Sequence, residues 1–185
     1  MSTIYLIRHG RTVANDRHLY CGSSDLPLSE GGMDALGKKH YDISAQRFLT
    51  SGMRRTEQTL ALLFGEVPRE VDERFREVDF GDFELRSYEE LKENPAYQAW
   101  ITGDNEVNIP PNGESGAQMT ERVLEAFREL AEGNRDTVLI THGGVIAAIM
   151  ANRFPAEGRN RYQWQPKPGE GYALCNGGYR FITGE

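Results

Sequence analysis

Two histidines of this sequence occupy equivalent places, each just beyond a short apolar run. His9 stands two residues after the run 4–7, and His142 stands two residues after the run 138–140. Uninterrupted apolar runs of this length are typical of strands that are buried on both faces, as in parallel sheets. Ligands of such sheets bind beyond the carboxyl ends of the strands, so the two histidines are candidates for one site.

The residues around His9 suit a phosphate group. Arg8 and Arg11 flank it, and a guanidinium pairs with two phosphate oxygens at once and keeps its charge. Gly10 allows a close approach of the backbone. An imidazole with its ordinary pKa of about 6.5 is largely neutral at pH 7, and nearby arginines favour that nucleophilic form. This segment alone is equally compatible with a structural histidine between two surface arginines.

A further pair of arginines, Arg54 and Arg55, follows a strand predicted over residues 46–50. Ser51 is expected to be the N-cap of a helix that ends at Gly65. The two arginines then lie near the positive end of a helix dipole, which is a favourable place for an anion. As an isolated pattern, this segment is better explained by two solvated arginines on a helix.

The remaining elements are predicted from caps, periodicity and turn residues. Two strands over 172–176 and 179–183 are expected to form a hairpin joined at Gly177 and Gly178. Strands that alternate with helices predict an α/β fold with a mainly parallel sheet. Helices are expected after Ser29 to about residue 41, after the Ser87 and Glu90 capping box to about residue 93, over 96–101, and after the Ser115 and Gln118 capping box to about residue 132.

Four segments, in order, resemble the signatures of one known family. They are Arg8-His9-Gly10-Arg11-Thr12 with Asn15, then 51–59 (SGMRRTEQT), 75–85 (FREVDFGDFEL) and 141–144 (THGG). Spread over residues 4 to about 146, this set is similar to that of the histidine phosphatase superfamily, also called the phosphoglycerate mutase-like family. The resemblance implies a three-layer α/β/α sandwich with a mainly parallel central sheet. The sequence departs from the family pattern at Thr56, Phe75, Leu85 and Thr141.

The resemblance also implies roles for single residues. His9 is expected to be the nucleophile, and Glu77 the proton donor to the leaving oxygen. Without the resemblance, Glu77 could not be distinguished from the other carboxylates of its segment. The residues expected to bind the phosphoryl group are Arg8, Arg55, His142 and Asn15, and those expected to line the substrate site are Thr12, Gly22 and Gly143, with Tyr20 and Glu114 as further candidates.

Composition excludes several classes of protein. The chain has 185 residues, of which 38% are hydrophobic and 26% charged, so we predict one globular domain over residues 1–185. A net charge of -7 argues against a general nucleic-acid or membrane-surface binder. Cys21 and Cys175 are far apart and suggest neither a zinc site nor a disulfide framework. With no signal peptide or membrane span indicated, a cytoplasmic location is expected.

The sequence therefore predicts a metal-independent phosphomonoesterase without cofactors, which acts on a small phosphorylated metabolite through a phosphohistidine. The nearest alternative is a phosphoglycerate mutase, although the short chain and Val13-Ala14 before Asn15 favour the phosphatase. Among the phosphatases, the compact size and motifs are shared with the α-ribazole phosphatases, but do not single them out. A non-catalytic phospho-ligand-binding module is the alternative from another class. The substrate depends on the loops 16–28, 84–115 and 154–171, and a monomer and a homodimer are both compatible with the sequence.

Overall fold

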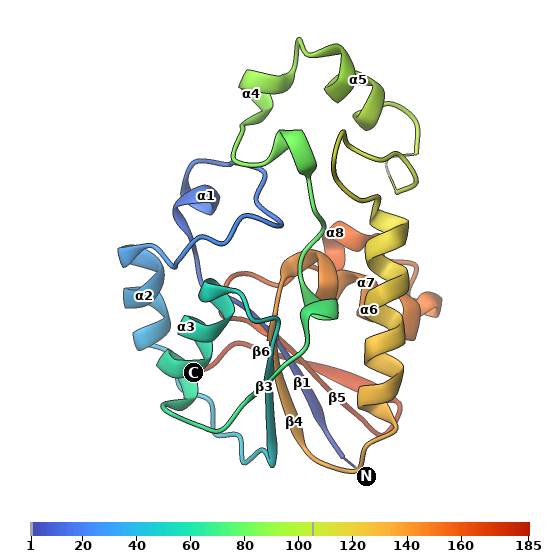
Figure 1. Ribbon diagram of the computed structural model, residues 1–185. Helices are drawn as coiled ribbons and strands as arrows, with labels where there is room; N and C mark the ends of the chain where they lie inside the picture. Colours follow the sequence, from blue (N-terminus) through green and yellow to red (C-terminus); the bar gives the residue numbers. More distant parts are fainter. Residues whose placement is uncertain (1, 105) are drawn as a thin grey trace.

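The computed structural model describes residues 2–104 and 106–185, and within them it contains a six-stranded sheet flanked by helices (Figure 1). The strand order is β3-β2-β4-β1-β5-β6. Strands β1 to β4 run parallel, whereas β5 and β6 form an antiparallel hairpin at one edge. The bounds are β1 Ile4–Arg8, β2 Arg47–Thr50, β3 Glu70–Val71, β4 Thr137–Thr141, β5 Gly171–Cys175 and β6 Gly178–Ile182.

The register brings the ends of the central strands level with one another. Arg8 pairs with Thr141 at the ends of β1 and β4, and the N–H of His9 donates to the carbonyl of Thr141 at 2.9 Å. On the other side of β4, β2 ends at Thr50, which pairs with Ile140. The segments that follow three adjacent parallel strands therefore leave the sheet at one edge, where α/β sheets bind their ligands.

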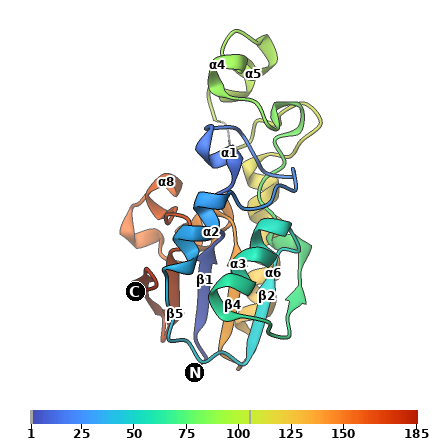
Figure 2. The ribbon, with the colours of Figure 1, turned by 90° about the vertical axis from the view of Figure 1, so that its left-hand side faces the viewer.

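Helices cover both faces of the sheet, as Figures 1 and 2 show. Side chains alternate along β1, so that Leu6 joins the core shared with α6 and α7, while Ile7 joins the core shared with α3. Helix α2 packs beside α3. The predicted three-layer α/β/α sandwich with a mainly parallel sheet is confirmed. The bounds are α2 Glu30–Gly37, α3 Arg54–Phe64, α6 Gly116–Ala131 and α7 Gly143–Arg153.

Residues 80–104, called the helical cap below, stand beyond the carboxyl ends of the parallel strands (Figures 1 and 2). The cap contains a 3-10 turn at Gly81–Phe83, helix α4 (Tyr88–Leu91) and helix α5 (Pro95–Ile101). It has a small core of its own, in which Tyr97 is buried. The hydroxyl of Tyr20, from the loop after β1, lies 2.6 Å from that of Tyr97 and links the cap to the edge of the sheet.

Several short elements were not predicted from the sequence. These elements are strand β3, helices α1 (Val13–Asp16) and α8 (Arg161–Trp164), and 3-10 turns at Glu73–Phe75, Gly81–Phe83 and Pro155–Glu157.

Among the described residues, no helix is both long and apolar enough to cross a bilayer.

The prediction for Ser51 is wrong. Helix α3 begins at Arg54 with Met53 in the N-cap position and without a side-chain cap. The hydroxyl of Ser51 lies instead 2.8 Å from Nε2 of His142. The Ser51 hydroxyl thus forms a hydrogen bond with a histidine that is distant in the sequence and does not cap the helix.

Other boundaries are shifted by a few residues. Ser29, Ser87 and Ser115 cap their helices as predicted, but α2 ends at Gly37 and α4 at Leu91, earlier than expected. The C-terminal hairpin starts one residue early, because its turn is formed by Asn176 and Gly177 at positive φ rather than by the two glycines.

Candidate active site

The two histidines lie side by side where β1 and β4 end. Their ring centroids are 5.1 Å apart in an edge-to-face arrangement. Both side chains are buried, His9 with 6% of its surface exposed and His142 with none. The parallel register of two adjacent strands thus brings together residues that are 133 positions apart in the sequence.

One ring nitrogen of His9 is fixed by the backbone. Nδ1 lies 2.6 Å from the carbonyl oxygen of Gly10, which can only accept a hydrogen bond. Nδ1 therefore carries the proton, and Nε2 keeps its lone pair. A Cβ on Gly10 would lie 2.5 Å from a terminal side-chain carbon of Leu36, so a larger residue at this turn would have to displace that side chain.

The hydrogen bonds of His142 define the opposite tautomer. Nε of Arg55 donates to its Nδ1 at 3.3 Å, and Nε2 then donates to the hydroxyl of Ser51. Burial, followed by the charges of Arg55 and Arg8, holds the pKa of His9 well below its ordinary value, and burial and the same arginines do so for His142. Both rings are therefore neutral at pH 7.

Arg55 is a buried cation, 1% exposed, on the first turn of α3. Its terminal nitrogens donate to the carbonyls of Gly22 at 2.7 Å and Ser24 at 2.8 Å. Burial lowers its pKa, although not enough to discharge a guanidinium. No carboxylate is paired with it among the described residues, so its charge is available to an anion.

Arg8 approaches the histidine pair from the end of β1. One terminal nitrogen donates to the carbonyl of Pro166 at 2.8 Å. Its Nε–H is buried and has no acceptor within the described part of the chain. A buried donor without a partner costs about 1–3 kcal/mol. A ligand oxygen that accepted this hydrogen bond would remove that cost.

Glu77 reaches the start of α7. Its carboxylate accepts the N–H of Gly144 at 2.8 Å and the N–H of Val78 at 3.0 Å. A Cβ on Gly144 would lie 2.3 Å from Oε1 of Glu77, and one on Gly143 would lie 3.1 Å from Cζ of Arg8. The two glycines after His142 thus make room for a carboxylate and a guanidinium beside the histidine pair.

The sequence model of the histidine phosphatase superfamily (branch 1) matches residues 4–173. The chain belongs to this superfamily. It is 30% identical to the adenosylcobalamin/α-ribazole phosphatase of Escherichia coli K12 over 165 residues, which cover 83% of this chain and 81% of that protein.

Two solved structures share its fold. The α-ribazole phosphatase of Shigella flexneri has a TM-score of 0.84 at 28% identity, covering 98% of this chain and 96% of that one. A phosphoglycerate mutase from Thermus thermophilus has a TM-score of 0.71 at 28% identity, covering 93% and 92%. The family and fold implied by the sequence motifs are confirmed.

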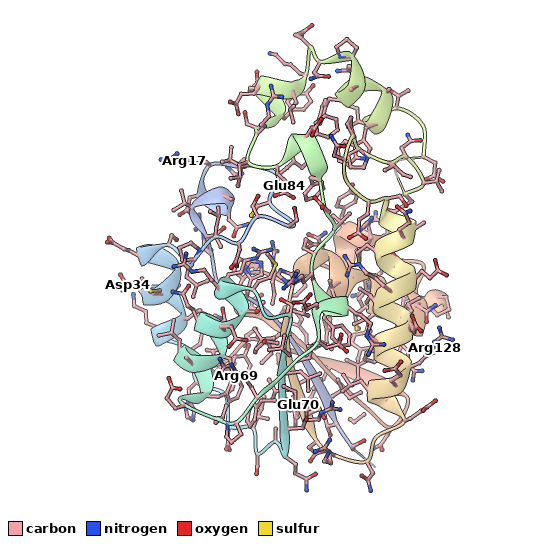
Figure 3. All side chains as sticks on the ribbon, viewed as in Figure 1. Arg17, Asp34, Arg69, Glu70, Glu84 and Arg128 are labelled. Atoms are coloured by element: carbon pink, nitrogen blue, oxygen red, sulfur yellow. The ribbon has the colours of Figure 1, made fainter. Side chains whose placement is uncertain are left out.

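In this histidine phosphatase, Glu84 organises the loop that binds Arg55. Its carboxylate accepts the N–H groups of Gly22 at 2.9 Å, Ser23 at 3.0 Å and Ser24 at 3.2 Å, together with that of Phe80 at 3.1 Å. Figure 3 shows Glu84 at the lower end of the helical cap. The carbonyls of this loop then face Arg55, so Glu84 positions Arg55 through the loop. Sequence reasoning noted Glu84 only as one acidic residue among several.

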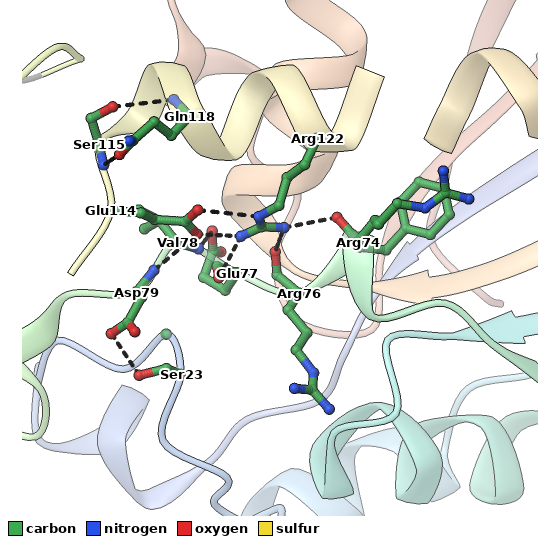
Figure 4. A network of polar contacts seen from close by, with 12 residues as sticks. Ser23, Arg74, Arg76, Glu77, Val78, Asp79, Glu114, Ser115, Gln118 and Arg122 are labelled. Atoms are coloured by element: carbon green, nitrogen blue, oxygen red, sulfur yellow. Dashed lines mark hydrogen bonds and ion pairs between the residues drawn. The ribbon is translucent and has the colours of Figure 1, made fainter. Parts of the chain in front are cut away.

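A second support, Arg122 of α6, was missed from the sequence. It donates to the carbonyls of Arg74 at 2.7 Å, Arg76 at 2.8 Å and Glu77 at 3.1 Å (Figure 4). It also forms an ion pair with Glu114, which was predicted as a possible substrate contact. Glu114 thus helps to hold Arg122, and both fix the segment that carries Glu77. The helix predicted after Ser115 includes Arg122, but its sequence pattern gave no sign of this partner.

The other predicted residues lie around this centre. Thr12 is the N-cap of α1, and its N–H and hydroxyl donate to Oδ1 of Asn15 at 2.9 and 3.1 Å. Asn15 is half-buried near Arg8 and lines a cavity with it. Gly22 is buried beneath the backbone of Val78, where a Cβ would lie 1.6 Å from the Val78 oxygen.

A cavity of about 290 Å³ opens beside Glu77. Its apolar wall includes Tyr20, Phe80 and Trp100, whose rings lie 5.1 to 6.0 Å apart in tilted and edge-to-face contacts. Aromatic rings in such arrangements present flat, apolar surfaces to a ligand. The remaining lining residues are Leu19, Cys21, Val78, Ile101, Glu114, Gly116, Gly144, Arg161, Tyr162 and Gln165.

Proposed function

We propose that this histidine phosphatase hydrolyses a small phosphomonoester through a phosphohistidine at Nε2 of His9. The observation that supports this role is the hydrogen bond from Nδ1 of His9 to the Gly10 carbonyl, which leaves Nε2 unprotonated in a neutral ring. His142 is also neutral, but both of its nitrogens are engaged, by Arg55 and Ser51. His9 is therefore the better nucleophile of the pair.

In the first step, Nε2 of His9 forms a bond to phosphorus while the bond from phosphorus to the leaving oxygen breaks. Glu77, in its protonated form, gives its proton to that oxygen, and the alcohol departs. In the second step, Glu77 takes a proton from water as the water oxygen attacks phosphorus, and the N–P bond breaks. The cycle releases one alcohol and one phosphate and restores both residues.

The positive charge of the site is proposed to come from the protein itself. Arg8 and Arg55 would bind the equatorial oxygens together with His142 and Asn15, with Thr12 and Gly143 shaping the pocket. Fixed donors of this kind supply much of the catalysis in phosphoryl transfer. Glu77 stands at the border between the histidine pair and the aromatic cavity, where the leaving group would lie.

For the substrate, we propose α-ribazole 5′-phosphate, because similar proteins are named as phosphatases of α-ribazole or of α-ribazole-5′-P. The aromatic cavity supports a leaving group with a flat ring system. Ribose 5-phosphate, which has no ring system on its sugar, is the matched comparison. Replacing Trp100 with Ala should lower kcat/KM about three- to tenfold for α-ribazole 5′-phosphate and leave ribose 5-phosphate unchanged. An equal loss for both substrates would contradict this placement.

The catalytic proposal is tested by phosphate release in EDTA, measured for the wild type and His9→Ala. Release that is lost in His9→Ala, and a base-stable, acid-labile phosphoryl label on the wild type, are expected. Isomerisation of 3-phosphoglycerate, followed in parallel, tests the mutase function suggested by the structural likeness to a phosphoglycerate mutase. Phosphate release by His9→Ala at the wild-type rate would exclude the phosphohistidine. Silence in both assays would support the non-catalytic binding module.

A further inference from the structure

A second cavity, of about 480 Å³, lies between the segment after β1, helix α2 and the segment 166–170. It shares Arg8 and Asn15 with the candidate active site. Three further cations line it, namely Arg11, Lys39 and Lys167. Glu170 is the one carboxylate of the lining, all of which lies in the described part of the chain. The remaining lining residues are Gly10, Gly32, Ala35, Leu36 and Pro168.

The four cations around this cavity outnumber the two carboxylates beside them, which are Glu170 of the lining and Asp16. Arg11 forms an ion pair with Asp16 at 2.5 Å. Nζ of Lys39, however, donates to a neutral acceptor, the carbonyl of Thr183 at 2.5 Å, so its full charge remains. Lys167 forms no ion pair within residues 2–104 and 106–185. In a chain with a net charge of -7, four cations around one cavity favour an anionic ligand.

The walls of this cavity are held closely by the fold. Gly169 has φ +75°, and its N–H donates to the carbonyl of Arg8 at 2.9 Å. A Cβ on Gly169 would lie 3.1 Å from the side chain of Lys39, and one on Gly32 would lie 2.2 Å from the carbonyl oxygen of Arg11. Such close packing fixes the positions from which the cationic side chains extend. The cavity is therefore a built feature rather than a gap between mobile loops.

We propose that this cavity is a second binding site, for a small polyanion of the phosphate class, separate from the site of the reacting phosphate. Lys39, Lys167 and Arg11 would bind the anion, while Leu36 provides an apolar wall. Arg8 borders both sites, so the two anions share one guanidinium and repel each other. Binding at either site then weakens binding at the other, which makes the second site inhibitory. This inference requires only that anions bind, and does not depend on the phosphohistidine step.

The test uses inorganic pyrophosphate as the probe and two charge reversals as matched variants. Lys167→Glu alters the cavity, whereas Lys38→Glu changes the net charge equally at an exposed neighbour of Lys39 that does not line it. Calorimetry is expected to show two binding sites for pyrophosphate in the wild type and in Lys38→Glu. In Lys167→Glu, one site should weaken at least about tenfold, since a cation that binds the anion becomes a repelling charge.

Kinetics with p-nitrophenyl phosphate provide the second readout. Pyrophosphate should inhibit the wild type with a mixed pattern, because it binds both the free and the substrate-loaded protein. In Lys167→Glu, inhibition should become purely competitive. A single calorimetric site in the wild type, or an equal effect of Lys167→Glu and Lys38→Glu, would overturn the second site. If no turnover is found, calorimetry still decides this question separately from the proposed function.

Discussion

Replacing Gly144 with Ala tests whether Glu77 is the proton donor. The new Cβ would lie 2.3 Å from Oε1 of Glu77, whereas ordinary contacts begin at 3.4 Å. The carboxylate must therefore recede by about 1 Å. A displacement of this size from the productive geometry can cost on the order of 100-fold in rate. The loss should depend on the leaving group, because only a poor leaving group needs the proton.

Two substrates separate this effect from a general loss of activity. For an alkyl phosphate, kcat/KM of Gly144→Ala should fall about 100-fold, or about 2.7 kcal/mol of transition-state stabilisation. For p-nitrophenyl phosphate, whose leaving anion is stable without a proton, the loss should be roughly threefold or less. Gly31→Ala is the control, since nothing lies within 4 Å of a Cβ at that exposed position of α2. Equal losses for both substrates in folded Gly144→Ala would refute the assignment of Glu77.

Three further predictions concern the supports of the site. In Glu84→Gln, one of the two acceptor oxygens is replaced by a donor, so at least one hydrogen bond from an N–H group of the loop is lost. The value of kcat/KM should then fall about tenfold or more. The control is Glu93→Gln, which changes the charge equally at an exposed position and should leave kcat/KM unchanged. Arg122→Met leaves a half-buried carboxylate and three carbonyls without their donor, and urea unfolding should show a loss of about 3 kcal/mol. The pKa values of His9 and His142 are lowered in the folded protein, so the unfolded chain binds more protons below about pH 6.5. Stability should therefore fall as the pH is lowered from about 6.5 to about 5, by on the order of 1–2 kcal/mol per histidine. His9→Asn should remove about half of that dependence in denaturation curves, and an unchanged slope would contradict the lowered pKa.

The parts of the site that could be predicted are those set by strand ends. His9 and His142 follow apolar runs, and the parallel register of β1 and β4 then places them together. The place of Arg55 could be predicted in the same way, since it follows β2 on the first turn of a helix, but its proposed role depended on the family resemblance. The choice of Glu77 needed the family resemblance, because its partner, the N–H of Gly144, lies 67 residues away.

The parts that could not be predicted depend on contacts without a local pattern. Glu84 meets its loop across about 60 residues of sequence, and Arg122 meets the Glu77 segment across 45. Neither contact leaves a periodicity, a cap or a turn signal in the sequence. For Ser51 the error is the opposite, because a local signal was present but did not decide the structure. Serine is a favoured N-cap residue, yet the hydroxyl of Ser51 binds a histidine 91 residues away.

The two glycines that begin α7 show how the site determines local sequence. Glycine in a helix is less favourable than alanine by roughly 1 kcal/mol, so Gly143 and Gly144 together weaken the start of this helix. Helix formation alone would select alanine at both positions. Alanine at 143 would crowd Arg8, and at 144 it would displace Glu77, so both glycines are explained by the groups packed against them. The two glycines make the start of α7 less stable, but they leave the space in which Arg8 and Glu77 pack beside the histidine pair.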